Sequence, residues 1–344
     1  MAVTSAKITS RTPFENGNSW GKVGAYERID GMIHFEVEPN NPSNSAIIDL
    51  QHSPDNDSGR VTFTSDFVLL QPSAMEPTRL LVDVVNRGRK RAIPDFNMVS
   101  ATLVPTHEID PGDGFLFNNG YAVVSVGWQY DVYRSSSLMG MDPPAVKVNG
   151  NVTEGINLVE IRPNQEQKCY LLANRVHKPY PSASADNKNA RILVKEWEDG
   201  PETEIPPSEW SFAKETENGP VPDVEHIYMD AGFQPGKIYH VIYQATNPVV
   251  SGATLMSVRD VGSWIKYGGP HCPVKSTVEH AYAYGISQTG RLLRHYLYTG
   301  MNLDEEGRQV YDGIRLFLWS IPYFCIIPGL TIYCLLYTSD AADE

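Results

Sequence analysis

The sequence has few cysteines, and they are Cys169, Cys272, Cys325 and Cys334. None of them forms a Cys-x-x-Cys pair, which argues against a disulfide framework and against a zinc knuckle. His271, Cys272 and His280 come closest to a metal cluster, but their spacing matches no common zinc site. We therefore expect no bound metal.

Positive charge is also scarce, because 28 Lys and Arg residues stand against 41 Asp and Glu residues and leave a net charge of −13. Binding of nucleic-acid phosphates needs clustered cations, so this composition argues against a nucleic-acid partner. Nucleotide-binding motifs are missing as well. The segment GFQPGK over 232–237 is one residue too short for a P-loop, and no Gly-x-Gly-x-x-Gly follows a strand. We expect no cofactor.

The first residues, MAVTSAKITSRTPF, lack the apolar core of a secretory signal, so a cytoplasmic location is the default expectation. A long uncharged run, 316–337, occurs near the other end and is long enough to span a membrane. Pro322 and Pro328 interrupt it, however, and CLLYTSDAADE resembles the translated sequencing-adapter ends found in assembled environmental reads. The sequence therefore predicts a non-native tail over 316–344 and no membrane partner.

Strand-like runs dominate the first part of the chain, and two Val-rich segments, 79–88 and 120–131, are typical of strands buried on both faces of a parallel sheet. Near the end a strand, a helix over 251–268, a second strand and a second helix closed by Gly300 follow one another. This alternation predicts an α/β layout. The expected parts are a β-rich N-terminal part (1–75), the first part of an α/β core (76–131), a loop-rich insertion or cap (132–237), the second part of the core (238–315) and the tail.

The segment YGISQTGRLL places a serine between glycines, where a strand passes directly into a helix. Gly285 lies two residues before Ser287, as in the Gly-x-Ser-x-Gly nucleophile elbow, but Thr289 stands where the second glycine belongs and Gly290 comes one later. Such an elbow exposes a serine hydroxyl above a sheet for nucleophilic attack. A serine that merely caps a helix would give the same short pattern.

Several segments together resemble a large, poorly characterised α/β-hydrolase-domain family with a β-rich N-terminal part. They are SWGKVGAYERIDG, LLVDVVNRGRK, GFLFNNGYAVVSVGWQYDV, YQATNPVVSGATLMSVRDVGSWIKYG and GISQTGRLLRHYLYTGMNLDEEGRQVYDG, between about residues 3 and 314. The resemblance implies a truncated α/β-hydrolase-like parallel sheet. It also implies that the Ser-Gln-Thr-Gly-Arg form of the elbow, with Thr289, is a family trait.

The resemblance further implies an oxyanion hole made by backbone N–H groups of Gln288 and of the loop with Asn86, Arg87 and Gly88. The alternative for that loop is a tight turn with a surface arginine. Residues at the end of the next strand are expected at the pocket rim, although a tryptophan there often only packs; they are Trp128, Gln129 and Asp131. Arg291 and Arg294 are expected to pair structurally, with Asp260, Asp304 or Asp312 as partners.

A serine hydrolase of this type places its acid and its histidine after the serine. The only later histidine is His295, about 12 Å along the same helix, which is beyond hydrogen-bond reach. The sequence therefore predicts a serine hydrolase for a small ester or related acyl substrate, as a fragment without its acid and base. The alternative is a non-catalytic binding or structural protein that keeps the elbow as architecture.

Overall fold

The computed structural model describes residues 2–53, 56–100, 105–148, 151–173 and 177–318, together with 326–327, 330–331 and 334–336. The chain divides into two compact units. The larger unit comprises Met1–Pro144 and Val250–Glu344, and the smaller unit comprises Ala145–Val249. Each unit is described by itself.

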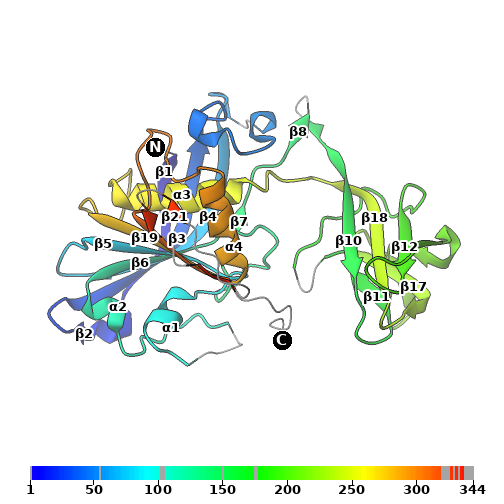
Figure 1. Ribbon diagram of the computed structural model, residues 1–344, viewed down its shortest axis with the longest axis horizontal. Coiled ribbons are helices and arrows are strands. Elements are labelled where there is room, and N and C mark those ends of the chain that lie inside the picture. Colours follow the sequence, from blue (N-terminus) through cyan, green and yellow to red (C-terminus); the bar gives the residue numbers. More distant parts are fainter. Residues whose placement is uncertain are drawn as a thin grey trace. The chain divides into compact units, whose positions relative to one another are not determined.

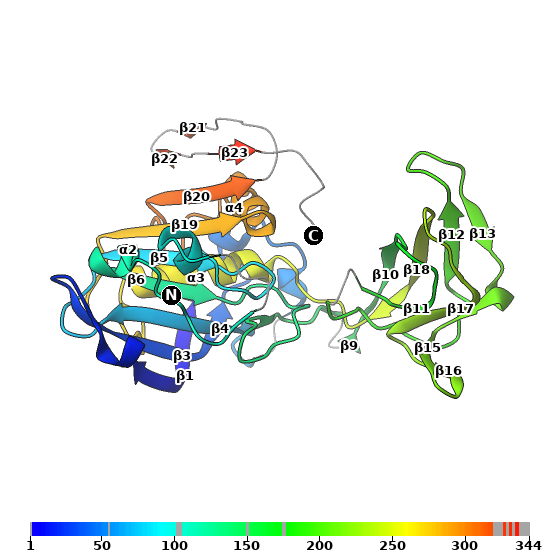
Figure 2. The same ribbon diagram turned by 90° about the horizontal axis from the view of Figure 1, so that it is seen from below.

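The larger unit is built on a mixed sheet with the strand order β1-β3-β4-β6-β5-β19-β20-β23, in which β2 pairs with β3 and β7 pairs with β4. Figure 2 shows β20, β19, β5, β6, β4, β3 and β1 stacked in that order. The strands of this sheet are β1 (Val3–Pro13), β2 (Ser19–Trp20), β3 (Gly24–Val37), β4 (Val61–Pro72), β5 (Arg79–Val84), β6 (Tyr121–Val126), β7 (Met141–Asp142), β19 (His280–Ile286), β20 (Gly313–Leu318) and β23 (Cys334–Leu336).

The centre of the sheet is parallel and its N-terminal side is antiparallel. Strand β5 pairs in parallel with both β6 and β19, and β19 pairs in parallel with β20. After their first residue, β5 and β6 are buried at every position, which agrees with coverage of both faces. Strands β1, β3 and β4 pair antiparallel and continue the same sheet. The predicted parallel sheet is therefore confirmed only for its centre, and residues 1–75 belong to the same layer.

Helices lie on both faces of this sheet. Figure 1 shows α3 and α4 on one face and α1 and α2 on the other. The α-helices are α1 (Ala92–Phe96), α2 (Phe115–Asn118), α3 (Ala253–Lys266) and α4 (Gln288–Tyr298), and the short 3-10 helices are η1 (Phe14–Gly17), η2 (Pro42–Asn44), η3 (Leu50–His52) and η4 (Pro207–Glu209). The two helices predicted near the end of the chain are confirmed as α3 and α4, and Gly300 has the positive φ of a C′ glycine, at 72°.

A buried ion pair fastens α3 to the N-terminal part of the larger unit. Arg259 and Asp260 are 0% and 2% exposed, and the Nε and Nη2 atoms of Arg259 donate to the two carboxylate oxygens of Asp260 at 2.7 and 3.0 Å. The remaining guanidinium nitrogen, Nη1, donates to the carbonyl of Ser43 at 3.0 Å. Both charges are thus paired where water cannot reach them, as buried ions require.

The smaller unit consists of short antiparallel strands around its own apolar core. Its core includes Ile192, Phe212, Ile227, Phe233 and Val241. The strands are β8 (Lys147–Val148), β9 (Asn151–Val152), β10 (Glu154–Ile161), β11 (Gln167–Leu171), β12 (Arg191–Lys195), β13 (Thr203–Ile205), β14 (Trp210–Ser211), β15 (Ala213–Thr216), β16 (Gly219–Pro222), β17 (His226–Phe233) and β18 (Ile238–Thr246). The segment expected to be loop-rich is therefore rich in strands.

The strand over 238–246 requires a correction. The sequence pattern predicts this strand within the α/β core, but β18 pairs antiparallel with β10 and β12 inside the smaller unit. Buried and partly exposed residues alternate along β18 from Val241 onwards, which is the pattern of a strand with one wetted face. The inserted unit thus spans Ala145–Val249, whereas 132–237 was expected.

The end of the chain lies largely outside the described residues. Leu316–Leu318, which the sequence analysis counted with the tail, form the second half of β20, and Leu316 is buried. Beyond them only β21 (Ile326–Ile327), β22 (Leu330–Thr331) and β23 are described. Pro322 and Pro328, on which the tail prediction partly rested, lie outside the described residues. Among the described helices, none has the length and apolar character needed to cross a membrane.

We predict that residues 145–249 fold when expressed alone. The unit has its own core, and its two ends meet in an antiparallel bridge between Ala145 and Val249, so excision leaves the chain ends together. The expected result is a dispersed amide NMR spectrum and a single cooperative urea transition. Collapsed amide dispersion would show that the unit depends on the rest of the chain.

Candidate active site

Ser287 joins β19 to α4 in a strained backbone conformation, with φ 56° and ψ −112°. A positive φ is unfavourable for a residue with a side chain, and such strain is concentrated at functional sites. The hydroxyl of Ser287 makes no capping hydrogen bond to α4. Within the described part of the chain this hydroxyl has no other hydrogen-bond partner either. The structure therefore does not support the interpretation of Ser287 as an ordinary helix cap.

Hydrogen bonds to neighbouring backbone hold this turn in place. The N–H of Ser287 donates to the carbonyl of Phe317 on β20 at 2.7 Å. The hydroxyl of Thr289 accepts from the N–H of Ile286 at 2.9 Å and donates to the carbonyl of Ile286 at 3.1 Å. Thr289 is fully buried. Thr289, which stands in place of the second glycine, thus fixes the end of β19 through two side-chain hydrogen bonds that a glycine could not make.

Gly285 is required by the close packing of β19 against α4. A Cβ added at this position would lie 2.6 Å from the carbonyl oxygen of Thr289 and 2.9 Å from Cδ1 of Leu293. Backbone cannot move away as a flexible side chain can, so this position excludes any larger residue. Gly290 is also buried, in the first turn of α4.

The loop after β5 is a tight two-residue turn. Asn86 and Arg89 exchange both backbone hydrogen bonds, at 2.8 and 2.9 Å. Arg87 and Gly88 between them have φ values of 50° and 82°, as a type I′ turn requires. The side-chain amide of Asn86 donates to the carbonyl of Ile286 at 2.7 Å. The structure thus brings this turn into contact with the residue that precedes Ser287.

The residues expected at the pocket rim follow β6. Trp128 is buried, and its Nε1 donates to the carbonyl of Val85 at 2.6 Å, so it braces the strand end just before Asn86. The side chain of Gln129 is also buried, while Asp131 is half-buried. The hydrogen bond from Trp128 therefore supports the end of β5.

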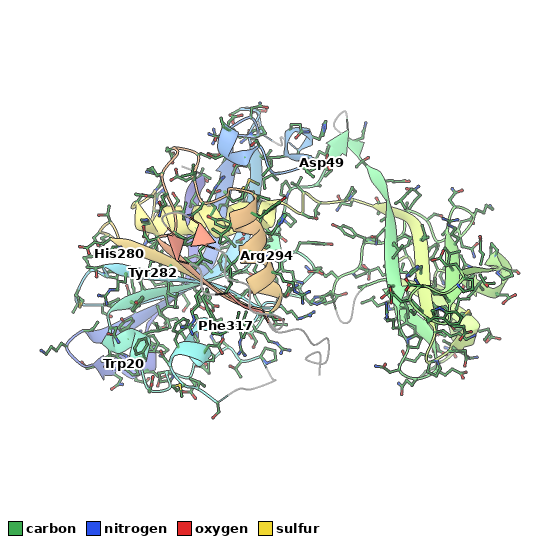
Figure 3. All side chains as sticks on the ribbon, in the orientation of Figure 1. Trp20, Asp49, His280, Tyr282, Arg294 and Phe317 are labelled. Atoms are coloured by element: carbon green, nitrogen blue, oxygen red, sulfur yellow. The ribbon has the colours of Figure 1, made fainter. Side chains whose placement is uncertain are left out.

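The pairing expected for Arg291 and Arg294 is wrong. The three aspartates have other partners: Asp260 pairs with Arg259, Asp304 with Arg308 at 2.7 Å, and Asp312 with Lys266 at 2.9 Å. Both arginines are exposed on α4, and Arg294 is labelled in Figure 3. The cations that pair with these aspartates are Arg259 and Lys266, which lie on α3, and Arg308, which lies four residues after Asp304.

The described residues supply no histidine base for Ser287. His295 lies in the last turn of α4, exposed and stacked beside Tyr298 with ring centroids 6.4 Å apart. Upstream, the Nδ1 atom of His107 lies 3.0 Å from the carbonyl of Ser136, and the Nε2 atom of His240 lies 3.1 Å from Glu160. These three imidazoles thus have contacts other than the hydroxyl of Ser287.

A cavity of about 220 Å³ adjoins the elbow. Its lining residues come from α1, β19 and β20, and they are Asp95, Phe96, Tyr284, Ile286, Arg315 and Phe317. The hydroxyl of Tyr284 donates to Asp95 at 2.7 Å, and the guanidinium of Arg315 stacks over the rings of Phe96 and Phe317. The lining thus combines four apolar or aromatic side chains with two charged ones, Asp95 and Arg315.

Asp83 is a buried acid that is not among the site residues predicted from the sequence. It ends the run LLVD on β5, and its Oδ2 accepts from the backbone N–H of Arg91 at 2.9 Å and from the hydroxyl of Ser125 at 2.8 Å. Burial raises its pKa to about 6, and these hydrogen bonds oppose the rise. A lone acid within an apolar strand run is the sequence signal that could have identified it. The carbonyl of Phe317 was missed because that residue was assigned to the tail.

We predict that Gly285→Ala destabilises the protein by about 1–3 kcal/mol, the usual cost of forcing an extra methyl group into a packed site. The reason is the backbone of Thr289, which the new Cβ would strike. Urea unfolding measures the loss. Gly155→Ala is the matched control, since a Cβ there meets nothing within 4 Å. Equal stability of the Gly285→Ala variant and wild type would contradict the packing described for the elbow.

Asp83 should make stability fall as pH rises. Its pKa is about 6 in the fold and 3.8 as the ordinary value, so the native state keeps a proton that the unfolded state releases. The stabilisation is complete below pH 3.8 and is lost as pH rises through 6, by on the order of 3 kcal/mol. Asp83→Asn should remove its own contribution to the fall between pH 4 and pH 7 in urea unfolding and leave that of Asp260, whose pKa burial also raises to about 6. The exposed Asp57→Asn should leave the whole fall unchanged. An unchanged pH dependence in Asp83→Asn would refute the assignment.

Comparison with known proteins adds one finding. Residues 236–320 match a family model described as an alpha/beta hydrolase domain. Neither the curated proteins nor the solved structures gave a match. Within the described residues, no group of three or more His, Cys, Asp or Glu side chains could hold a metal ion. The matched segment contains α3, β19, Ser287, α4 and β20, so the candidate elbow lies inside the part of the chain that is similar to an alpha/beta hydrolase domain.

Proposed function

We propose that Ser287 is the nucleophile of a hydrolase that cleaves an ester or a related acyl bond. The observation that carries this proposal is the strained conformation of Ser287 at a strand-to-helix turn, within the segment that matches an alpha/beta hydrolase domain. A serine that only caps a helix does not need a positive φ. A serine that must present its hydroxyl beyond the edge of a sheet needs the tight turn that a positive φ gives.

The chemistry begins with attack of the Ser287 hydroxyl oxygen on the acyl carbon. The carbonyl oxygen then carries a negative charge that backbone N–H groups can stabilise. Gln288 is the first residue of α4, so its N–H has no acceptor within the helix, and the positive end of the helix dipole adds to the effect. The Asn86–Gly88 turn, held beside Ile286 by the amide of Asn86, is the source of the second donor.

The serine must lose its proton during this attack, and a serine without an adjacent base is a poor nucleophile. The described residues place no imidazole on the hydroxyl of Ser287. The proposed attack therefore requires a base that no described histidine places on Ser287. Loss of triad members lowers rates by about 10⁴ to 10⁶-fold in serine proteases, so the chain as printed should hydrolyse esters only slowly.

The substrate we propose is a small, largely uncharged acyl ester. The apolar and aromatic wall formed by Phe96, Ile286 and Phe317 suits an aliphatic or aromatic acyl group better than a charged one. The cavity volume of about 220 Å³ limits that group to a small size.

Labelling with a fluorophosphonate probe tests the nucleophile. We expect slow labelling of the peptide that contains Ser287, detected by mass spectrometry, and none in Ser287→Ala. Ser276→Ala, at another partly exposed serine, is the control and should label as wild type. Labelling that survives in Ser287→Ala would exclude this residue as the nucleophile. No labelling of wild type would favour the non-catalytic alternative.

Replacing Ser287 with cysteine tests whether the elbow presents a reactive side chain. The result distinguishes a correct site that lacks its base from a site that is not catalytic. In Ser287→Cys the N-terminus of α4 should lower the pKa of the new thiol, while burial raises the pKa of Cys272 to about 12. Iodoacetamide should therefore alkylate the thiol at position 287 at least about tenfold faster than Cys272. Equal or slower alkylation would show that the elbow does not present its side chain for reaction.

A further inference from the structure

A second cavity, of about 190 Å³, lies beside the segment that follows the Asn86–Gly88 turn. Three consecutive cationic residues of that segment line it: Arg89, Lys90 and Arg91. The rest of the lining is mixed: Ile93, Val99 and Ile109 contribute apolar side chains beside two prolines, and serine, threonine and acidic residues contribute polar ones. This cavity shares no lining residue with the one beside Ser287.

The three cations differ in their surroundings. Arg91 is neutralised by Asp95, at 2.7 Å. Arg89 is exposed and lies at the rim. Lys90 is half-buried, and within the described part of the chain its ammonium group has neither a hydrogen-bond acceptor nor a salt-bridge partner. The ammonium group of Lys90 is not sealed from solvent, so a ligand that enters the cavity can reach it. Of the three cations, Lys90 is the one that is neither neutralised by a carboxylate nor exposed at the rim.

The charged groups around Lys90 do not compensate it. The carboxylate of Asp30 is bound by Arg28 at 2.7 and 2.8 Å, and that of Asp83 by Ser125 and the backbone of Arg91. Burial, together with the nearby charge of Arg28, lowers the pKa of Lys90, and the weaker attraction of Asp83 and Asp30 opposes this. The two acids of the lining, Glu108 and Asp110, are exposed.

Size and wall chemistry limit the ligand. An apolar cavity of about 150 Å³ is known to hold a benzene ring, so about 190 Å³ accommodates a ring or a short branched chain with one carboxylate. The aliphatic side chains would contact the apolar body, and the ammonium would pair with the carboxylate. A charge-assisted hydrogen bond of this kind is stronger than a neutral one.

We propose that this cavity binds a small organic carboxylate with a compact apolar body, and that Lys90 is its counter-ion. The proposal is independent of hydrolysis at Ser287, because it rests on a different cavity and a different residue.

Benzoate is the probe, and calorimetric titration of the full chain gives its affinity. Lys90→Met keeps an unbranched side chain, one atom shorter, but removes the charge, and it should weaken binding at least about tenfold, as loss of a charged pair predicts. Lys22→Met, at an exposed lysine of the same unit, should bind as wild type. Benzamide, which has the same shape without the charge, should bind at least about tenfold more weakly than benzoate.

A second measurement avoids the chance that Lys90→Met fails to fold. The lysines of the wild-type chain are converted to their ¹³C-dimethyl forms, which keep the charge, and are titrated by NMR. Benzoate that pairs with the ammonium must raise the pKa of Lys90, by about one unit if it prefers the charged form tenfold, and must leave that of Lys22 unchanged. Absence of benzoate binding, equal affinity in Lys90→Met, equal binding of benzamide or an unmoved Lys90 pKa would each overturn the proposal.

Discussion

The conformation of Ser287 is the constraint on which the candidate site depends. A positive φ at a residue with a side chain costs on the order of 1–3 kcal/mol and survives only where the surroundings enforce it. Here the carbonyl of Phe317 holds the serine N–H, and the hydroxyl of Thr289 bonds both backbone groups of Ile286. Gly285 lets α4 approach closely enough for these contacts. The four residues around Ser287 thus act as one clamp.

Parallel pairing explains why distant segments meet at this clamp. Strands β5 and β19 are adjacent and parallel, so the residues that follow them emerge at the same edge of the sheet. The turn after β5 therefore reaches the end of β19, and the amide of Asn86 bonds the carbonyl of Ile286 across some 200 positions of sequence. Strand β20, on the other side of β19, brings Phe317 to the same edge.

Much of this arrangement could be predicted from sequence, because it rests on local patterns. Continuous apolar runs identified β5 and β6, helical spacing identified α3, and the run of small residues around Ser287 located the turn into α4. Strand β18 was recognised as a strand, but its partners were not predicted, because pairing depends on residues such as Leu158 and Leu193 that are far away in sequence. The partner of Asp312, Lys266, was missed for the same reason, whereas Arg259 and Arg308 lie only one and four residues from Asp260 and Asp304.

The two acids near the turn after β5 show how such non-local contacts shape a site. Asp83 is buried at the end of β5 and bonds the backbone of Arg91, and the side chain of Arg91 pairs with Asp95. Asp95 in turn accepts from Tyr284, two residues before Ile286 on β19. A continuous set of polar contacts therefore runs from the strand before the Asn86–Gly88 turn, through α1, to the strand before Ser287. Because each member is fixed by the next, the turn and the elbow are held relative to each other by more than the single bond from Asn86. Backbone N–H groups of the turn and of Gln288 that are held in this way can stabilise an oxyanion without first having to reorient.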